Sequence, residues 1–547
     1  MRIDKDQIIP TSDGLELRAN IYRPDAEGRF PVILVHGPYG KDVHFADGFT
    51  RQWNRLLELH PGLLEGSTGQ YLRWEAVDPE RWVPAGFVCV HIDSRGTGAS
   101  PGHIDPFSPR ETQDHVEAIG WAADAPWSNG RVGLLGISYY AINQWLAAAA
   151  RPRGLAAFAP WEGGSDHYRD WSRHGGMLSH AFLSGWWDSQ IIPNQHGNST
   201  THYRDRATAR PNTGPALSPE LLAGNRARYI DELARHRLDD AWHRERSPVL
   251  ERITAPLLSA GNWGGPGVHL RGNVEGWLRA GSDRKWLSMH AGTHYESFYL
   301  PDHIATQQRF FGHFLRGDAN GWQTEPPVRL TIRDPRGNFR RAEQEFPLAR
   351  TVARSYALSA DLRLADTVAG GRVSFAADGQ GLDFATAPFA QDCEFTGFPA
   401  LRLRLCSSTT EADLFALLRA IDPAGQEWVI EGAHEPTPIA RGWLRASHRK
   451  TDPVRAIAGR PWHTHDEPWP LTPGEFVDVE MEIWPTSVVL PAGWRLALSL
   501  AGRDPTVAGP PPRIRHDHPE DRAAAAGATI TLDLAGCALR LPWIPAA

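Results

Sequence analysis

The residues that could do covalent chemistry are easiest to see around Ser138, in the stretch VGLLGISYYAINQW (132–145). The general nucleophile elbow is G-x-S-x-G, in which a serine sits on a sharp turn between a buried strand and a helix. Here Gly136 and Ser138 keep the first half of that motif, while Tyr140 replaces the second glycine. An apolar run precedes Ser138 and a helical run follows it, so we predict a nucleophile rather than an ordinary serine at a strand end.

A serine nucleophile needs a histidine to take its proton, a carboxylate to orient that histidine, and hydrogen-bond donors for the oxyanion. In α/β-hydrolases the three catalytic groups follow the chain order serine, acid, histidine. His294 ends the last predicted strand of the sheet and is the predicted base. His290 and His269 lie in the same region and compete with it for this role.

Short apolar runs indicate the strands that must position these groups. The runs cover residues 30–37, 86–98, 131–138, 154–161, 255–263 and 285–294. Near-continuous apolar runs of this length are typical of strands buried on both faces of a parallel sheet. Helical spacing falls between them and after the last one, in residues 111–126, 139–151 and 304–317.

These patterns divide the chain into three parts. Residues 1–162 and 251–320 form an α/β domain, and residues 163–250, which carry short helical patches, form a helical cap inserted over its sheet. Residues 321–547 contain β-rich segments with frequent Gly and Pro turns, which is typical of an antiparallel sandwich or jelly roll. The predicted fold class is α/β, an α/β-hydrolase domain with a helical cap insertion and a C-terminal β jelly-roll domain.

Composition argues against several kinds of partner. The chain has 547 residues, a formal net charge of −7 and no long basic block, so no nucleic acid is expected. It contains no apolar run long enough to span a bilayer and begins without an apolar signal core, so we expect a cytoplasmic protein and no membrane partner. The four cysteines are scattered and no H-E-x-x-H motif occurs, so no metal or other cofactor is predicted. The expected partner is a small-molecule ester or amide substrate, and a homo-oligomer is left open.

Several motifs, in order along nearly the whole chain, resemble one group of serine hydrolases. They are PYGK (38–41), DSRGTGAS (93–100), IGWAADAPWSNGRVGLLGISY (119–139), FFGHFLRG (310–317), GFPALRLRLCSS (397–408) and LPAGWRLALSL (490–500). The sequence is similar to the cocaine esterase and X-Pro dipeptidyl-peptidase group, the CocE/NonD type of hydrolase. This resemblance implies a C-terminal jelly-roll domain, and it specifies the family better than the substrate.

The resemblance also implies roles for residues around Ser138. The elbow of that group is G-x-S-Y-x-G, which GISYYA (136–141) follows except at the last position. By the resemblance, the backbone N–H of Tyr139 and the hydroxyl of Tyr39 donate to the oxyanion, and His294 is the base. A phenolic hydroxyl suits this task because it donates one directed hydrogen bond without carrying a charge.

The acid is where the sequence departs from the group. The usual W-Y-D motif would place an aspartate at Gly264, where this chain reads GNWGG. Glu162, Asp166 and Glu275 remain as candidates. We favour Glu162, because it follows the neighbouring predicted strand and has the length to reach His294. The alternative is that Glu162 binds a substrate amine or pairs with an arginine.

The predicted function is cleavage of a carboxylic ester or amide by a serine hydrolase through an acyl-enzyme at Ser138. Trp161, Trp187 and Trp263 are expected to line an aromatic substrate pocket, although each alone fits a packing role equally well. Two alternatives stay open. One is an X-Pro or aminoacyl peptidase or acylase, which would hold an amine with a carboxylate, and the other is a catalytically weak binding protein on a hydrolase scaffold.

Overall fold

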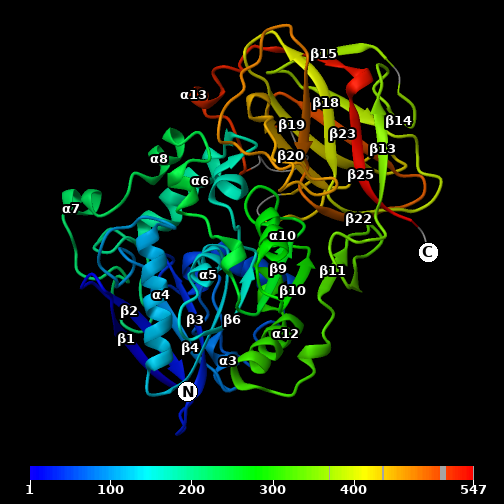
Figure 1. Ribbon diagram of the computed structural model, residues 1–547. Coiled ribbons are helices and arrows are strands. Elements are labelled where there is room, and N and C mark those ends of the chain that lie inside the picture. The colour runs from blue at the N-terminus through cyan, green and yellow to red at the C-terminus, as the bar shows by residue number, and fades with distance from the viewer. Residues whose placement is uncertain (369, 434–435, 506–512, 546–547) are drawn as a thin grey trace.

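The N-terminal part of the chain is built on a ten-stranded sheet in the order β1-β2-β4-β3-β5-β6-β9-β10-β11-β12. The computed structural model describes residues 1–368, 370–433, 436–505 and 513–545 (Figure 1). The strands are β1 (Arg2–Pro10), β2 (Glu16–Arg23), β3 (Phe30–Gly37), β4 (Val88–Asp93), β5 (Ser128–Ile137), β6 (Leu155–Trp161), β9 (Leu257–Asn262), β10 (Lys285–His290), β11 (Val328–Ile332) and β12 (Phe339–Glu343). Neighbouring strands from β4 to β11 run parallel, and β1, β2 and β12 add antiparallel edges.

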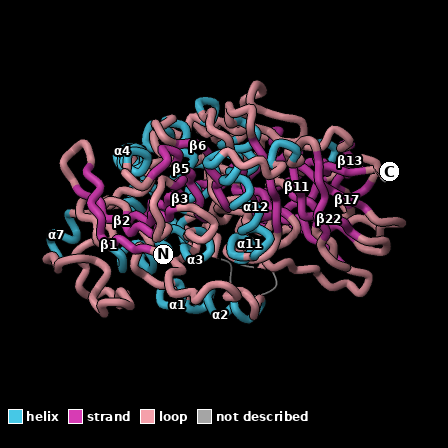
Figure 2. Tube along the Cα trace, turned by 90° about the horizontal axis from the view of Figure 1, so that it is seen from below, coloured by secondary structure: helices cyan, strands magenta, loops and turns pink. Residues whose placement is uncertain are grey.

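Successive side chains of the central strands enter two different apolar layers. In β3, Ile33 and Val35 belong to one buried cluster, whereas Val32 and Leu34 belong to another. Helices α4 (Pro109–Asp124) and α10 (Leu270–Arg279) supply the second cluster, and α3 (Pro79–Trp82) and α12 (Pro301–Phe311) the first. Figure 2 shows α4 and α3 on opposite sides of the sheet. This double covering explains why the central strands read as continuous apolar runs.

The predicted α/β fold class is confirmed, and the differences lie at the edges of the sheet. The hairpin of β1 and β2 was not among the expected strands, because β1 is largely exposed and lacks a continuous apolar run. At the other edge, β11 pairs in parallel with β10 and carries β12 with it. The first sheet therefore extends past residue 320, into the range expected for the β domain.

The segment between β6 and β9 covers one edge of the sheet with short helical pieces, as expected of a cap. These are η1 (His167–Ser172), α6 (His180–Trp186), η2 (Trp187–Ile191), η3 (Ile192–Asn194), α7 (Pro219–Gly224), α8 (Tyr229–Arg235), α9 (Ala241–Arg244) and η4 (Leu250–Arg252), with a small hairpin of β7 (Arg173–His174) and β8 (Met177–Leu178). Buried Arg173 donates to Asp521 at 2.9 Å, and the Gly175 carbonyl accepts from the Arg445 backbone at 2.8 Å. These contacts fix the cap to the C-terminal domain.

The C-terminal part is an antiparallel sandwich of a nine-stranded and a four-stranded sheet around a single apolar core. The larger sheet contains β13 (Val352–Leu358), β14 (Leu364–Ala365), β15 (Arg372–Ala376), β17 (Cys393–Gly397), β18 (Ala400–Ser407), β21 (Val477–Glu482), β22 (Thr486–Leu490), β24 (Thr529–Asp533) and β25 (Ala538–Ile544). The smaller contains β16 (Leu382–Ala385), β19 (Asp413–Ile421), β20 (Ala440–Arg445) and β23 (Arg495–Ala501). The predicted β sandwich is confirmed.

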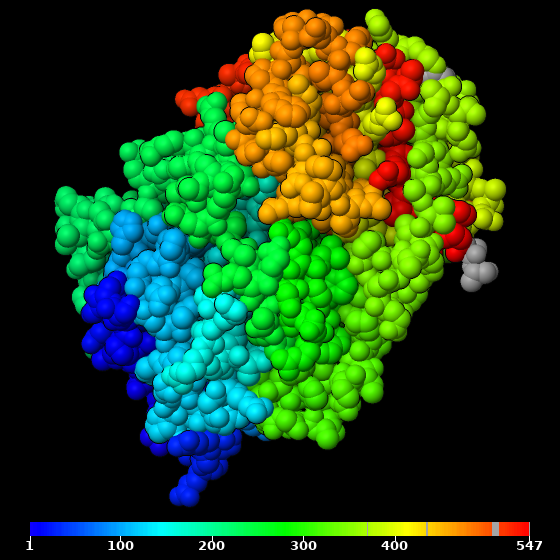
Figure 3. All heavy atoms as spheres, in the orientation of Figure 1, coloured from blue at the N-terminus to red at the C-terminus, as the bar shows by residue number. Residues whose placement is uncertain are grey.

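Figure 3 shows the cap, the α/β part and the sandwich abutting one another over the face in view. No helix in the described ranges combines the length and the apolar character that crossing a membrane would require. Helix α5 (Tyr139–Ala150) directly follows β5 and Ser138. The other helices are α1 (Phe45–Gly48), α2 (Thr50–Leu59), α11 (Glu296–Tyr299), η5 (Gly312–Arg316), η6 (Trp322–Thr324), η7 (Ala446–His448), α13 (Pro519–Arg522) and η8 (Leu534–Gly536).

Candidate active site

Four side chains singled out by the sequence gather at one edge of the first sheet. Ser138 follows β5, Glu162 follows β6, His269 lies between β9 and α10, and His294 follows β10. These strands are consecutive neighbours in the sheet and run parallel. The carboxyl ends of parallel strands meet at the same edge, which is where α/β proteins bind their ligands.

The backbone at Ser138 adopts a conformation that few residues other than glycine occupy, with φ 57° and ψ −115°. Its N–H donates to the carbonyls of Trp161 and Glu162, both at 3.1 Å, which ties the turn to the end of β6. Gly136 is required here, because a Cβ atom on it would lie 2.6 Å from the Cβ of Tyr140. Strain of this kind persists where the surroundings enforce it, and it is found at functional sites.

The histidine in contact with Ser138 is His269. The distance between Ser138 Oγ and His269 Nε2 is 3.1 Å. The ring of His269 lies face to face with that of His294, with centroids 4.8 Å apart and planes inclined by 7°. His294, the base predicted from sequence, therefore stacks on His269, and His269 is the histidine that contacts Ser138. The sequence analysis named His269 only as an alternative base.

Both ring nitrogens of His294 face carboxylates. Nδ1 lies 2.9 Å from Glu162 Oε2, and Nε2 lies 2.8 Å from Glu75 Oε1. Burial by itself would lower the pKa of His294, but the two carboxylates raise it to about 10. Burial also raises the pKa of Glu75 to about 7, whereas His294 and His290 hold the pKa of Glu162 below its usual value against the effect of burial. The arrangement favours a charged imidazolium between two carboxylates.

Glu75 is a site residue that sequence reasoning missed. It precedes α3, and its backbone carbonyl accepts from the N–H of Ile137, next to the nucleophile. One sequence feature could have pointed to Glu75: like Glu162, it follows a tryptophan in the dipeptide Trp-Glu. Both glutamates also have positive φ values, 59° and 49°. The sequence does not reveal that two such turns meet at one histidine.

The other candidate acids lie in ion pairs elsewhere. Asp166 contacts the Arg169 guanidinium at 2.9 Å, and Glu275 pairs with Arg460. At Gly264 a Cβ atom would lie 2.8 Å from the Cα of Gly432, in the C-terminal domain. Backbone of the sandwich therefore occupies the space that a side chain at residue 264 would need.

The two predicted oxyanion donors lie on either side of Ser138. The Tyr39 hydroxyl accepts from the indole N–H of Trp186 at 3.1 Å and also interacts with the Ser138 side chain. Burial raises the pKa of Tyr39 well above its usual value, so the phenol keeps its proton. Tyr139 is the first residue of α5, where backbone N–H groups have no intrahelical partner.

A small, mostly aromatic cavity opens beside Ser138. Its free volume is about 30 Å³, enough for little more than a water molecule. The lining residues are Tyr39, Phe107, Ser138, Tyr139, Ile142, Trp171, Phe182, Leu183, Trp186, Val268 and His269. The tryptophans that line it are therefore Trp171 and Trp186.

The tryptophans named from sequence take other positions. Trp161 donates its indole N–H to Ser297 Oγ at 2.9 Å, and Trp263 donates to the Thr331 carbonyl at 2.8 Å. Trp187 lies in the cap, and its ring stacks on Tyr229 with centroids 5.9 Å apart. None of the three is among the lining residues of the cavity at Ser138. Sequence reasoning placed them by nearness to strand ends, which does not give side-chain direction.

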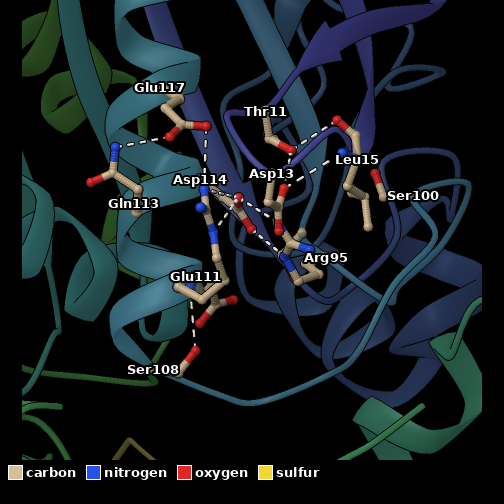
Figure 4. Close-up of polar contacts among 12 residues, drawn as sticks. Thr11, Asp13, Leu15, Arg95, Ser100, Ser108, Glu111, Gln113, Asp114 and Glu117 are labelled. Carbon is tan, nitrogen blue, oxygen red and sulfur yellow. Dashed lines mark hydrogen bonds and ion pairs between the residues drawn. The ribbon is translucent and has the colours of Figure 1, made fainter.

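A larger cavity of about 400 Å³ is also bordered by Tyr139. Its lining includes Arg95, Asp105 and Glu111, and the Tyr139 hydroxyl donates to both carboxylate oxygens of Glu111 at 2.7 and 2.8 Å. Figure 4 shows Glu111 beside its cap residue Ser108 and shows Arg95 paired with Asp114. Most of the lining surface is apolar, and the charged side chains along it are largely paired within the protein.

One group among the described residues has the spacing of a metal site. Glu162, His269 and His294 each offer one ligand atom, and these atoms lie within 4.8 Å of one another. Sequence spacing predicts no metal, and it cannot reveal this group because the residues come from three separate turns. In the structure Nε2 of His269 faces Ser138, and both ring nitrogens of His294 face carboxylates. Both histidines of this group are therefore already engaged with side chains of the protein.

Comparison with known proteins gives one consistent family. Residues 13–296 match the family described as X-Pro dipeptidyl-peptidase (S15 family), and residues 320–535 match the X-Pro dipeptidyl-peptidase C-terminal non-catalytic domain. Cocaine esterase from Rhodococcus sp. is 27% identical over 410 residues, which cover 68% of this chain and 65% of that protein.

Two solved structures extend the likeness over the whole chain. A CocE/NonD family hydrolase from Staphylococcus aureus is 28% identical with a TM-score of 0.85, covering 99% of this chain and 94% of the other. An aminopeptidase from the marine sediment archaeon Thaumarchaeota archaeon shares the fold at 16% identity, with a TM-score of 0.71 and coverage of 100% and 96%.

Proposed function

The chain belongs to the S15 family of X-Pro dipeptidyl-peptidases and is a serine hydrolase, and on that premise we propose that it cleaves a carboxylic ester or amide through an acyl-enzyme at Ser138. The observation that carries the proposal is the serine itself. It stands on a strained strand-to-helix turn, contacts an imidazole nitrogen at 3.1 Å, and lines a cavity together with Tyr39.

The oxyanion of the tetrahedral intermediate is stabilised by the Tyr39 hydroxyl and the Tyr139 backbone N–H. Tyr39 supports this role because it is buried, keeps its proton and interacts with the Ser138 side chain. Neutral donors fixed before the reaction are worth more in a site from which water is excluded. Glu162 takes the part of the triad acid, and the sequence assigns the base to His294. The imidazole that contacts Ser138, however, is that of His269.

The lining of the cavity favours a small, uncharged acyl group. Among the described residues that line it, none is a carboxylate. Glu75 and Glu162 are bonded to His294, and Glu111 accepts from the hydroxyl of the lining residue Tyr139. An aminoacyl or X-Pro substrate brings a free ammonium group that would lack an anionic partner there. The peptidase alternative therefore has the family name in its favour and the chemistry of this cavity against it.

A labelling experiment tests the proposal. Purified protein is treated with a fluorophosphonate probe and assayed on 4-nitrophenyl acetate and on an alanyl-proline anilide, with Ser138→Ala as the matched control. We expect labelling of Ser138, turnover of the acetyl ester, and loss of both in the variant. Labelling with turnover of the anilide alone would favour the peptidase. Folded wild-type protein that is neither labelled nor active would favour the binding protein.

A further inference from the structure

We propose that His269 is the general base for Ser138, and that Glu162, His294 and Glu75 form a fixed group that positions it and carries the charge of a triad acid. This inference rests on the proposed hydrolase function and deepens it. It departs from the sequence-based assignment of His294 as the base, and it adds Glu75 to the site.

The first support is the position of the imidazole nitrogens. A general base must lie within hydrogen-bond reach of the proton that it removes, and His269 Nε2 is 3.1 Å from Ser138 Oγ. With its hydrogen on Nδ1, the neutral ring offers a lone pair at Nε2 to the serine hydroxyl. In His294 the corresponding Nε2 atom is bonded to Glu75 at 2.8 Å.

The second support is the protonation that the carboxylates impose on His294. A ring nitrogen that bonds an ionised carboxylate must carry hydrogen, and both nitrogens of His294 face carboxylates. Such a ring has no lone pair with which to accept the serine proton. The raised pKa of His294, about 10, agrees with this geometry.

The third support is charge. Above the raised pKa of Glu75, about 7, two ionised carboxylates and one imidazolium sum to a single negative charge, which is the charge that the aspartate of a triad supplies. The His294 ring lies flat against His269, with centroids 4.8 Å apart, so it fixes the plane of the base. Once His269 is protonated, the two ionised carboxylates balance the positive charges of both rings. Residue 264 carries no side chain, and the buried glutamates of two other loops stand in for the missing carboxylate.

With His269 as the base, the proton of Ser138 is removed and later returned by the same ring nitrogen. The Ser138 Oγ–H proton moves to His269 Nε2 as Oγ bonds the carbonyl carbon, and the carbonyl electron pair moves onto its oxygen, which Tyr39 and Tyr139 bind. When the carbonyl re-forms, the bond to the leaving oxygen or nitrogen breaks, and His269 returns the proton to that atom. Water attacks the acyl-enzyme by the same route, giving the carboxylic acid and free Ser138.

Imidazole rescue tests the assignment of the base. In His269→Ala we expect kcat for an acetyl ester to fall about 10⁴- to 10⁶-fold, the loss seen when a triad base is removed. Added imidazole should restore part of that rate, following the ionisation of free imidazole, because it enters the space next to Ser138. In His294→Ala we expect a loss of about 10²-fold from misplacement of the base, with no rescue.

Two further variants separate loss of catalysis from loss of folding. His294→Gln retains one amide donor and replaces His294→Ala where the latter fails to fold. His448→Gln removes another buried histidine, one that contacts His465 in the C-terminal domain at 3.0 Å, and should leave kcat within a few-fold of wild type. Thermal unfolding of each variant reports its folding.

Two outcomes overturn the inference. One is a larger loss in His294→Ala, with imidazole rescue there and not in His269→Ala. The other is a normal rate of fluorophosphonate labelling in folded His269→Ala. Both are distinct from failure of the proposed function itself, in which wild-type protein is neither labelled at Ser138 nor active on esters.

Discussion

The turns after β5 and β9 follow strands of the same sheet, yet they differ in how far their roles can be read from the local sequence. The first keeps the family's nucleophile motif and forms a strained elbow at Ser138 from a few consecutive residues. The second carries Gly264 where the resemblance implies an aspartate, and it brings His269 to the serine. The negative charge of the site comes from Glu75 and Glu162, in two other loops. A nucleophile depends on local backbone shape, whereas charge can be supplied by any loop that reaches the same place.

The largest effect is expected when the negative charge of Glu162 is removed. Glu162→Gln should lower kcat about 10³- to 10⁴-fold, because the amide neither holds His294 as an imidazolium nor balances the charge on the base. KM should change much less, since Glu162 does not line the cavity. The measurement is steady-state hydrolysis of an acetyl ester.

Asp166→Asn is the matched control for this change. Asp166 is also a carboxylate that pairs with a cation, Arg169, but it lies outside the His294 cluster. It should leave kcat of the folded enzyme within a few-fold of wild type, even where it lowers stability. Near-normal turnover in Glu162→Gln would show that the charge of the site does not come from this loop.

The same contrast explains what could be predicted from sequence. The α/β sheet, the sandwich and the turn at Ser138 follow from apolar runs, turn residues and a local motif. Glu162 could be chosen over Glu275 because adjacent parallel strands end at one edge, and its contact with His294 at 2.9 Å is present. Which histidine faces Ser138, and that Glu75 arrives from a distant loop, depend on side-chain directions that spacing does not determine.

A second test concerns the space at the end of β9. Gly264→Ala should destabilise the protein by about 1–3 kcal/mol, the usual cost of overpacking, because its Cβ would lie 2.8 Å from the Cα of Gly432. Gly265→Ala is the matched control, since its Cβ would meet nothing closer than 3.3 Å. Denaturant unfolding of the two variants measures the difference. Equal stability would mean that the sandwich does not restrict residue 264.

A third test concerns Glu111, the carboxyl group that accepts from the Tyr139 hydroxyl. Burial raises the pKa of Glu111 from 4.5 to about 8, with Asp105 and Asp114 adding to the rise and hydrogen bonds from Tyr139 and the Phe107 backbone opposing it. A carboxyl whose pKa is raised on folding stabilises the protein most below pH 4.5, and this contribution is lost as the pH rises toward 8.

Glu111→Gln should therefore flatten the fall of unfolding free energy between these pH values, by at most about 1.4 kcal/mol per pH unit. Glu117→Gln on the same helix is the control, because the pKa of Glu117 is lowered and its contribution is lost only as the pH falls (Figure 4). Denaturant unfolding at a series of pH values separates the two. An unchanged slope in Glu111→Gln would mean that Glu111 is ionised beside Tyr139, next to the nucleophile turn.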